Sequence, residues 1–151
     1  MNVPYRVLVA DAHPVFRAGL QALLASLPDF LLVAEASTGH ETLRLTAELK
    51  PDVVVLDVAF IDVIQTIKEQ GTHVLVLSER EDDALLFTAL RSGARGYLFK
   101  SAGHDEIIRA LYAVAHGEAI FSAAIAERLP KFFAGLAALS SSKVLQQLTT
   151  R

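Results

Sequence analysis

The sequence predicts an α/β domain with a doubly wound, five-stranded parallel sheet, followed by a C-terminal helical linker. Short apolar runs alternate with longer amphipathic segments along most of the 151 residues. This alternation is typical of a parallel sheet with helices on both faces. Polar residues also stand where several apolar runs end, which is where an open parallel sheet forms its ligand crevice. With 52% hydrophobic residues, the chain can bury a single core.

The strands are predicted from short runs rich in Val, Leu, Ile and Phe. The five runs cover residues 5–10, 30–36, 52–56, 73–77 and 96–99. The third run is continuously apolar, as expected for a parallel strand that is buried on both faces. We therefore expect this strand to be buried within the sheet.

The helices are predicted from amphipathic periodicity and from the residues that start or stop them. They cover residues 14–26, 41–49, 62–69, 82–91 and 105–116. Pro14 suits a first helical turn, and Pro51 stops the second helix. Gly71 and Gly93 are expected to end the third and fourth helices. Each helix follows a strand, which gives five βα units.

Beyond Gly117 the pattern is helical only, so we predict one domain at residues 1–118 and a helical linker at 119–151. Ser122 is expected to cap the linker helix. The linker is more apolar than an exposed segment should be, which predicts a homodimer through this region. The alternative is a monomer in which the segment folds back. The apolar residues are Ile125, Leu129, Phe132, Phe133, Leu136 and Leu139.

Composition excludes several classes of function for this segment. The net charge of −3 and the lack of a basic run argue against direct contact with nucleic acid. The absence of cysteine excludes a disulfide scaffold or a thiolate metal site and fits a reducing, cytoplasmic location. The first residues show no signal-peptide pattern, and no apolar run is long enough to span a membrane.

Four polar side chains stand at the ends of predicted strands. They are Asp11, Asp57, Ser78 and Lys100. Because the carboxyl ends of parallel strands meet at one edge of the sheet, we expect these side chains to share a pocket. Two carboxylates, a hydroxyl and an ammonium in one pocket suit the handling of a phosphoryl group, which needs charge neutralisation and positioning.

Four segments together resemble the receiver domain of bacterial two-component response regulators of the NarL/FixJ (LuxR-type) family. They read VLVADAHPVFR at 7–17, PDVVVLD at 51–57, VLVLS at 74–78 and GARGYLFK at 93–100. The resemblance covers residues 5 to about 130. It implies a flavodoxin-like receiver fold, a role in phosphorelay signal transduction and transcription regulation rather than an enzyme activity, and a sensor histidine kinase as partner.

The resemblance also implies a role for each site residue. Asp57 matches the phosphoacceptor, and Asp11 matches the first of two acidic residues that hold Mg²⁺ together with it. Ser78 matches the hydroxyl that binds the phosphoryl group, and Lys100 matches the lysine that pairs with that group. Ser78 and Tyr97 match the pair that switches on activation.

Two departures from the family pattern affect the metal site. Ala12 stands where the family has its second acidic residue, and a methyl group cannot coordinate a cation. The loop after Asp57 also lacks the Pro-Gly turn of the family and is roughly five residues short. Because divalent sites depend on the number of charged ligands, we predict weak or absent Mg²⁺ binding.

The chain ends in Leu148-Thr149-Thr150-Arg151, which resembles the opening of the helix-turn-helix domain that follows the receiver in this family. This resemblance predicts that DNA is contacted only through a C-terminal domain that the chain does not contain.

Other interpretations of the same residues stay open at this point. Asp11, Asp57 and Ser78 can be ordinary helix caps, Lys100 a surface lysine and Tyr97 a core aromatic. All five histidines, His13 included, are interpreted as structural or surface residues. Two alternative functions follow: a pseudo-receiver that serves as a phosphorylation-independent dimerisation or protein-interaction module, and a small hydrolase with Asp57 as nucleophile.

Overall fold

The structure is a computed structural model that describes residues 3–131, 133 and 134. The chain divides into two compact units, Met1–Phe121 and Ser122–Arg151. The second unit contains helix α6 (Ala123–Ala126), and the Ser122 hydroxyl accepts the Ile125 N–H at 3.3 Å. This bond confirms the predicted cap. Parts of the predicted linker lie outside the described residues, namely Phe132, Leu136, Leu139 and residues 148–151.

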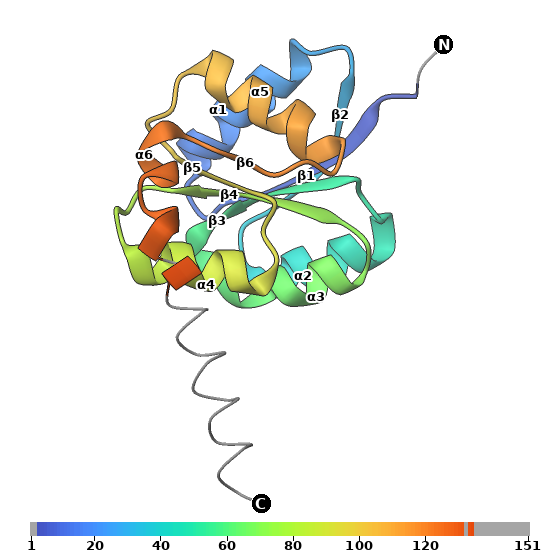
Figure 1. Cartoon of the computed structure of the whole chain (residues 1–151). Coiled ribbons are helices and arrows are strands. Elements are labelled where there is room, and N and C mark those ends of the chain that lie inside the picture. Colours follow the sequence, from blue (N-terminus) through green and yellow to red (C-terminus); the bar gives the residue numbers. More distant parts are fainter. Residues whose placement is uncertain (1–2, 132, 135–151) are drawn as a thin grey trace, which may run out of the picture. The chain divides into compact units, whose positions relative to one another are not determined.

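The first unit is built on one parallel sheet in the order β2-β1-β3-β4-β5-β6 (Figure 1). The sheet has six strands, whereas the sequence predicted five, because a two-residue strand pairs with β5 at the edge. The doubly wound parallel fold itself is confirmed. The strands are β1 (Tyr5–Ala10), β2 (Phe30–Ala36), β3 (Val53–Asp57), β4 (His73–Ser78), β5 (Gly96–Phe99) and β6 (Ile120–Phe121).

Helices cover both faces of the sheet, as the strand and helix alternation predicted. In Figure 1, α1 and α5 lie on one face, and α2, α3 and α4 lie on the other. None of the helices in the described part of the chain is long and apolar enough to span a membrane. The helices are α1 (Pro14–Ala25), α2 (Gly39–Leu49), the 3-10 helix η1 (Val58–Val63), α3 (Ile64–Glu69), α4 (Asp83–Ser92) and α5 (His104–Ala115).

The core lies between the central strands and the helices. Every residue of β3 is buried, which confirms the expectation from its continuous apolar run. Leu20 and Leu24 of α1 and Ile107 and Leu111 of α5 pack with the apolar side chains of the central strands in one cluster. Burial of these apolar side chains stabilises the central strands, and the polar residues at the ends of these strands are held in position as a result.

Helix ends follow the signals in the sequence. Gly93 has a φ of +108° and ends α4, and Gly71 has a φ of +86° just after α3. Both lie in the left-handed region that favours glycine. At the other end of the molecule, the Tyr112 hydroxyl on α5 donates to Asp29 at 2.7 Å. This hydrogen bond raises the pKa of Tyr112 and ties α5 to the loop before β2.

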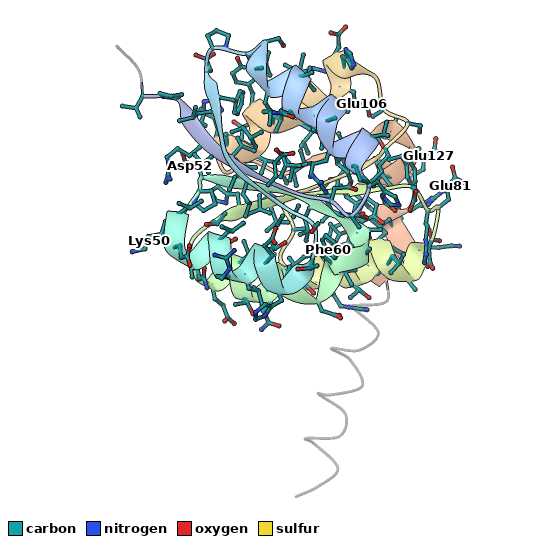
Figure 2. The ribbon with its side chains drawn as sticks, turned by 180° about the vertical axis from the view of Figure 1, so that it is seen from behind. Lys50, Asp52, Phe60, Glu81, Glu106 and Glu127 are labelled. Carbon is teal, nitrogen blue, oxygen red and sulfur yellow. The ribbon has the colours of Figure 1, made fainter. Side chains whose placement is uncertain are left out.

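The strand order reverses between β1 and β3, because β2 lies on one side of β1 and the later strands lie on the other. Ligands of open parallel sheets bind at such a switch point, outside the carboxyl ends of the strands. Lys50 and Asp52 lie just before β3 and mark the amino ends of the strands, whereas Glu81 follows β4 and marks their carboxyl ends (Figure 2). The candidate site therefore lies on the same side as Glu81.

Candidate functional site

Three charged side chains meet at the carboxyl ends of β1, β3 and β5. The Lys100 ammonium (Nζ) lies 2.7 Å from Asp11 Oδ2 and 3.4 Å from Asp57 Oδ2. Both aspartates are 2% exposed, and the Lys100 side chain is 9% exposed. Charges that are withdrawn from water to this extent interact strongly with one another, so the ammonium is the main counter-charge of the two carboxylates.

Lys100 is held in place from two directions. Its backbone N–H donates to the Ser78 carbonyl at 2.7 Å, which joins the ends of β4 and β5. Its ammonium also lies 4.5 Å from the centre of the Phe16 ring on α1, within range of a cation–π interaction. Lys100 is therefore a positioned residue of the pocket, and the alternative of an ordinary surface lysine does not describe it.

The two oxygens of Asp57 have different partners. Oδ1 accepts the Ala59 N–H at 3.1 Å and so caps η1, while Oδ2 faces Lys100. Asp57 is therefore both a helix cap, through Oδ1, and a member of the charged pocket, through Oδ2. The cap leaves Oδ2 as the oxygen on the cationic side of the pocket.

Asp11 is oriented by the backbone that follows it. Its Oδ1 accepts the His13 N–H at 2.7 Å, and its own backbone N–H donates to the Ala36 carbonyl at 3.0 Å. The cap position of α1 is His13, whose side chain makes no capping bond. Asp11 is therefore not the helix cap that was considered as an alternative.

The imidazole of His13, which the sequence interpretation took as a structural or surface residue, is a fourth member of the pocket. Its Nδ1 lies 3.1 Å from Asp11 Oδ1, 3.6 Å from Asp57 Oδ2 and 3.2 Å from Lys100 Nζ. The signal was Pro14, because a residue before proline is restricted to extended backbone. His13 has this backbone, with φ −91° and ψ 108°.

Ser78 lies at the same edge of the sheet but bonds to its own loop. It is fully buried, and its hydroxyl oxygen lies 3.0 Å from both the N–H and the carbonyl oxygen of Arg80. Within the described part of the chain, no hydrogen bond joins the Ser78 side chain to Asp57 or Lys100. The hydroxyl therefore belongs to a local turn between β4 and α4.

Tyr97 lies within β5, three residues before Lys100. It is 1% exposed and pairs with Val76 on β4 and Phe121 on β6. A tyrosine at this depth contributes to the core of the sheet.

Asp11, His13 and Asp57 form the one group of three or more potential metal ligands among residues 3–131, 133 and 134. One ligand atom from each lies within 4.8 Å of the others. Ala12 is exposed beside them and offers a methyl group. The donor set thus has two carboxylates and an imidazole nitrogen, whereas Mg²⁺ prefers oxygen ligands alone. The residues present do not fit an all-oxygen magnesium site.

Comparison with known proteins agrees with this geometry. The family model for the response regulator receiver domain matches residues 7–112. The chain belongs to this family. The receiver is 31% identical over 159 residues to the nitrate/nitrite response regulator NarL of Escherichia coli K12, covering 98% of this chain and 71% of NarL. It is 36% identical over 120 residues to the transcriptional regulatory protein LiaR of Bacillus subtilis, covering 75% of this chain and 57% of LiaR.

A solved LuxR-family response regulator from Aurantimonas sp. SI85-9A1 has the same fold. It superposes with a TM-score of 0.79 at 29% identity, covering 85% of this receiver and 97% of the solved chain. The chain is therefore a receiver of the NarL/LuxR type, a group of two-component response regulators involved in transcription regulation. Receivers of this kind interact with sensor kinases, and they bind Mg²⁺ through acidic residues.

Proposed function

We propose that this chain is the cytoplasmic receiver module of a transcriptional response regulator, with Asp57 as the phosphoacceptor of a sensor histidine kinase. The phosphoryl group then shifts the receiver between two states. DNA is contacted by a C-terminal domain beyond this chain. The lengths of NarL and LiaR, of which this chain covers 71% and 57%, support that domain.

One observation carries the proposal. The Asp57 carboxylate is buried at the switch point of the sheet, with one oxygen facing the Lys100 ammonium and the other facing the Ala59 amide. In a phosphoryl transfer, a carboxylate oxygen forms a new bond to phosphorus as the bond to the donor breaks. The negative charge of the transferred group then needs cationic and N–H partners that are already in place.

We propose further that this receiver binds Mg²⁺ weakly. Two buried carboxylates remain, but Ala12 supplies no oxygen, and the Lys100 ammonium lies 2.7 Å from Asp11. An ammonium at that distance neutralises part of the charge that a divalent cation needs. The main alternative is a pseudo-receiver that keeps the fold without accepting a phosphoryl group, and the same features would favour it.

Acetyl phosphate with Mg²⁺, followed by intact mass measurement, tests the proposal. We expect a single added phosphoryl group on the native chain and none on Asp57→Asn, because the amide is a poor nucleophile. Asp62→Asn is the matched control, since Asp62 is an exposed acid on η1, and it should keep the adduct. An unmodified native chain would favour the pseudo-receiver. An adduct that persists in Asp57→Asn would refute the assignment of Asp57.

We also propose a homodimer formed through the apolar segment at residues 122–139. Three of its large apolar side chains are described: Ile125 is buried, Leu129 is partly buried, and Phe133 is 60% exposed. Sedimentation equilibrium at about 10 µM, where an interface of standard size should assemble, is expected to give a dimer mass. The Phe133→Asp variant should have a mass closer to that of the monomer, because burying a charge in an apolar interface costs free energy. Leu31→Asp, at a half-exposed leucine on β2, is the control. A monomer mass for the native chain would refute the dimer.

A further inference from the structure

We propose that Asp57 accepts a phosphoryl group without a divalent cation, because the Lys100 ammonium already serves as the cation of this pocket. This role of Lys100 rests on the proposed function, since it concerns how Asp57 is phosphorylated. The residues present do not fit an all-oxygen magnesium site, and Ala12 supplies neither an oxygen nor a charge. The positive charge that the phosphoryl group needs must then come from the chain itself.

The Lys100 ammonium lies among the three side chains that could hold a metal ion. Its Nζ is 2.7 Å from Asp11 Oδ2, 3.2 Å from His13 Nδ1 and 3.4 Å from Asp57 Oδ2. One ligand atom from each of these three residues lies within 4.8 Å of the others. A metal ion bound to all three would therefore come into close contact with the ammonium, and the two positive charges would repel each other.

The position of Lys100 does not depend on the carboxylates alone. Its backbone N–H donates to the Ser78 carbonyl at 2.7 Å, and its Nζ lies 4.5 Å from the centre of the Phe16 ring. The side chain is 9% exposed. An ion that displaced the ammonium would break the cation–π contact with Phe16 and move a buried lysine out of its packing. These contacts favour the ammonium over Mg²⁺ in this pocket.

The charge of the pocket also reduces the need for a metal ion. The carboxylates of Asp11 and Asp57 and the ammonium of Lys100 together have a formal charge of −1, whereas a third carboxylate at position 12 would make it −2. A phosphoryl group brings about two negative charges at neutral pH. The phosphorylated pocket therefore has one negative charge fewer to neutralise than a pocket with three acids.

The transfer step needs no metal-bound atom. A carboxylate oxygen of Asp57 forms a bond to the phosphorus of acetyl phosphate while the bond from phosphorus to the acetate oxygen breaks. Acetate leaves with the electron pair of that bond, and no proton is gained or lost. Charge on the phosphoryl oxygens is stabilised by groups that are already in place, namely the Lys100 ammonium, 3.4 Å from Oδ2, and the Ala59 N–H, 3.1 Å from Oδ1.

Phosphorylation by acetyl phosphate in a chelator or in excess Mg²⁺, followed over time by intact mass, tests the proposal. We expect the adduct to form on the native chain at the same rate in both conditions at equal ionic strength. Lys100→Gln should slow its formation by about a hundredfold, because the amide carries no charge to stabilise the transition state. Lys68→Gln, at an exposed lysine on α3, is the matched control and should keep the native rate.

Ala12→Asp tests the proposal in the opposite direction. The added carboxylate makes the pocket more negative and offers Mg²⁺ an oxygen ligand, so this variant should be phosphorylated at least about tenfold faster in Mg²⁺ than in the chelator. Ala18→Asp adds the same charge on the exposed side of α1 and should show no such difference.

The possible outcomes separate this role of Lys100 from the proposed function. A native chain that forms the adduct in Mg²⁺ but not in the chelator would overturn metal independence and leave Asp57 as the phosphoacceptor. A native chain without an adduct in either condition would refute both. Equal rates for Lys100→Gln and the native chain would overturn the role of the ammonium. The comparison of the native chain in the two conditions does not depend on the stability of any variant.

Discussion

Replacing Ala12 with aspartate is expected to raise the Mg²⁺ affinity of the receiver by at least tenfold, or about 1.4 kcal/mol. Asp11 and Asp57 already provide two carboxylates at the switch point, and a third charged oxygen ligand next to them adds both a donor and a negative charge. Isothermal titration of Mg²⁺ into the native and variant chains at constant ionic strength measures the difference.

Ala18→Asp controls for the added charge alone. Ala18 is exposed on α1, so the variant has the same net charge as Ala12→Asp but gains no ligand in the pocket. Its Mg²⁺ affinity should stay at the native value. If Ala12→Asp and the native chain bind Mg²⁺ equally, the missing carboxylate is not what weakens the site, and the Lys100 ammonium becomes the cause to examine.

Replacing Lys100 with methionine is expected to lower the free energy of unfolding by about 3 kcal/mol in the presence of a chelator. Methionine keeps most of the apolar stem, but the two buried carboxylates lose the ammonium that lies 2.7 and 3.4 Å from them. Loss of the contact with the Phe16 ring adds a smaller cost. Urea denaturation of both chains measures the change.

The double variant Asp11→Asn with Lys100→Met distinguishes charge from packing. Removing one carboxylate relieves the repulsion between the two acids, so the double variant should recover most of the stability that Lys100→Met loses. Lys68→Met, at an exposed lysine on α3, should change stability by about 0.5 kcal/mol or less. A Lys100→Met variant as stable as Lys68→Met would show that the carboxylates do not depend on the ammonium.

The fold could be predicted closely because its signals are local. The bounds of β1, β2 and β5 are those predicted from apolar runs, and Gly93 ends α4 as expected. The strand β6 could not be predicted, because its two residues, Ile120–Phe121, are too few to show a hydrophobic periodicity. It is a strand because it pairs with β5, and this pairing is a tertiary contact. The predicted helix at 62–69 begins at Ile64 and follows a 3-10 helix that Asp57 caps.

The site could be predicted in its charges but not in its contacts. Asp11, Asp57 and Lys100 each end an apolar run, and parallel strands bring such ends together. His13 ends no strand, and its side chain is 52% exposed, so only the turn before Pro14 directs it towards the carboxylates. For Ser78 the position could be predicted, because it ends β4. Its hydrogen bond to Arg80 could not be predicted, because it depends on the conformation of an irregular loop that has no sequence periodicity.

The Asp57 carboxylate, which we propose as the phosphoacceptor, also accepts the Ala59 N–H and so caps η1. A change in the charge of that carboxylate therefore also changes the strength of the hydrogen bond that starts η1. Val58 and Val63 of η1 are buried in the core. A weaker hydrogen bond at Asp57 therefore loosens the start of η1, whereas the burial of these two side chains still holds the rest of it in place. The Ala59 N–H is therefore the backbone group that a change at the Asp57 carboxylate reaches through a direct hydrogen bond.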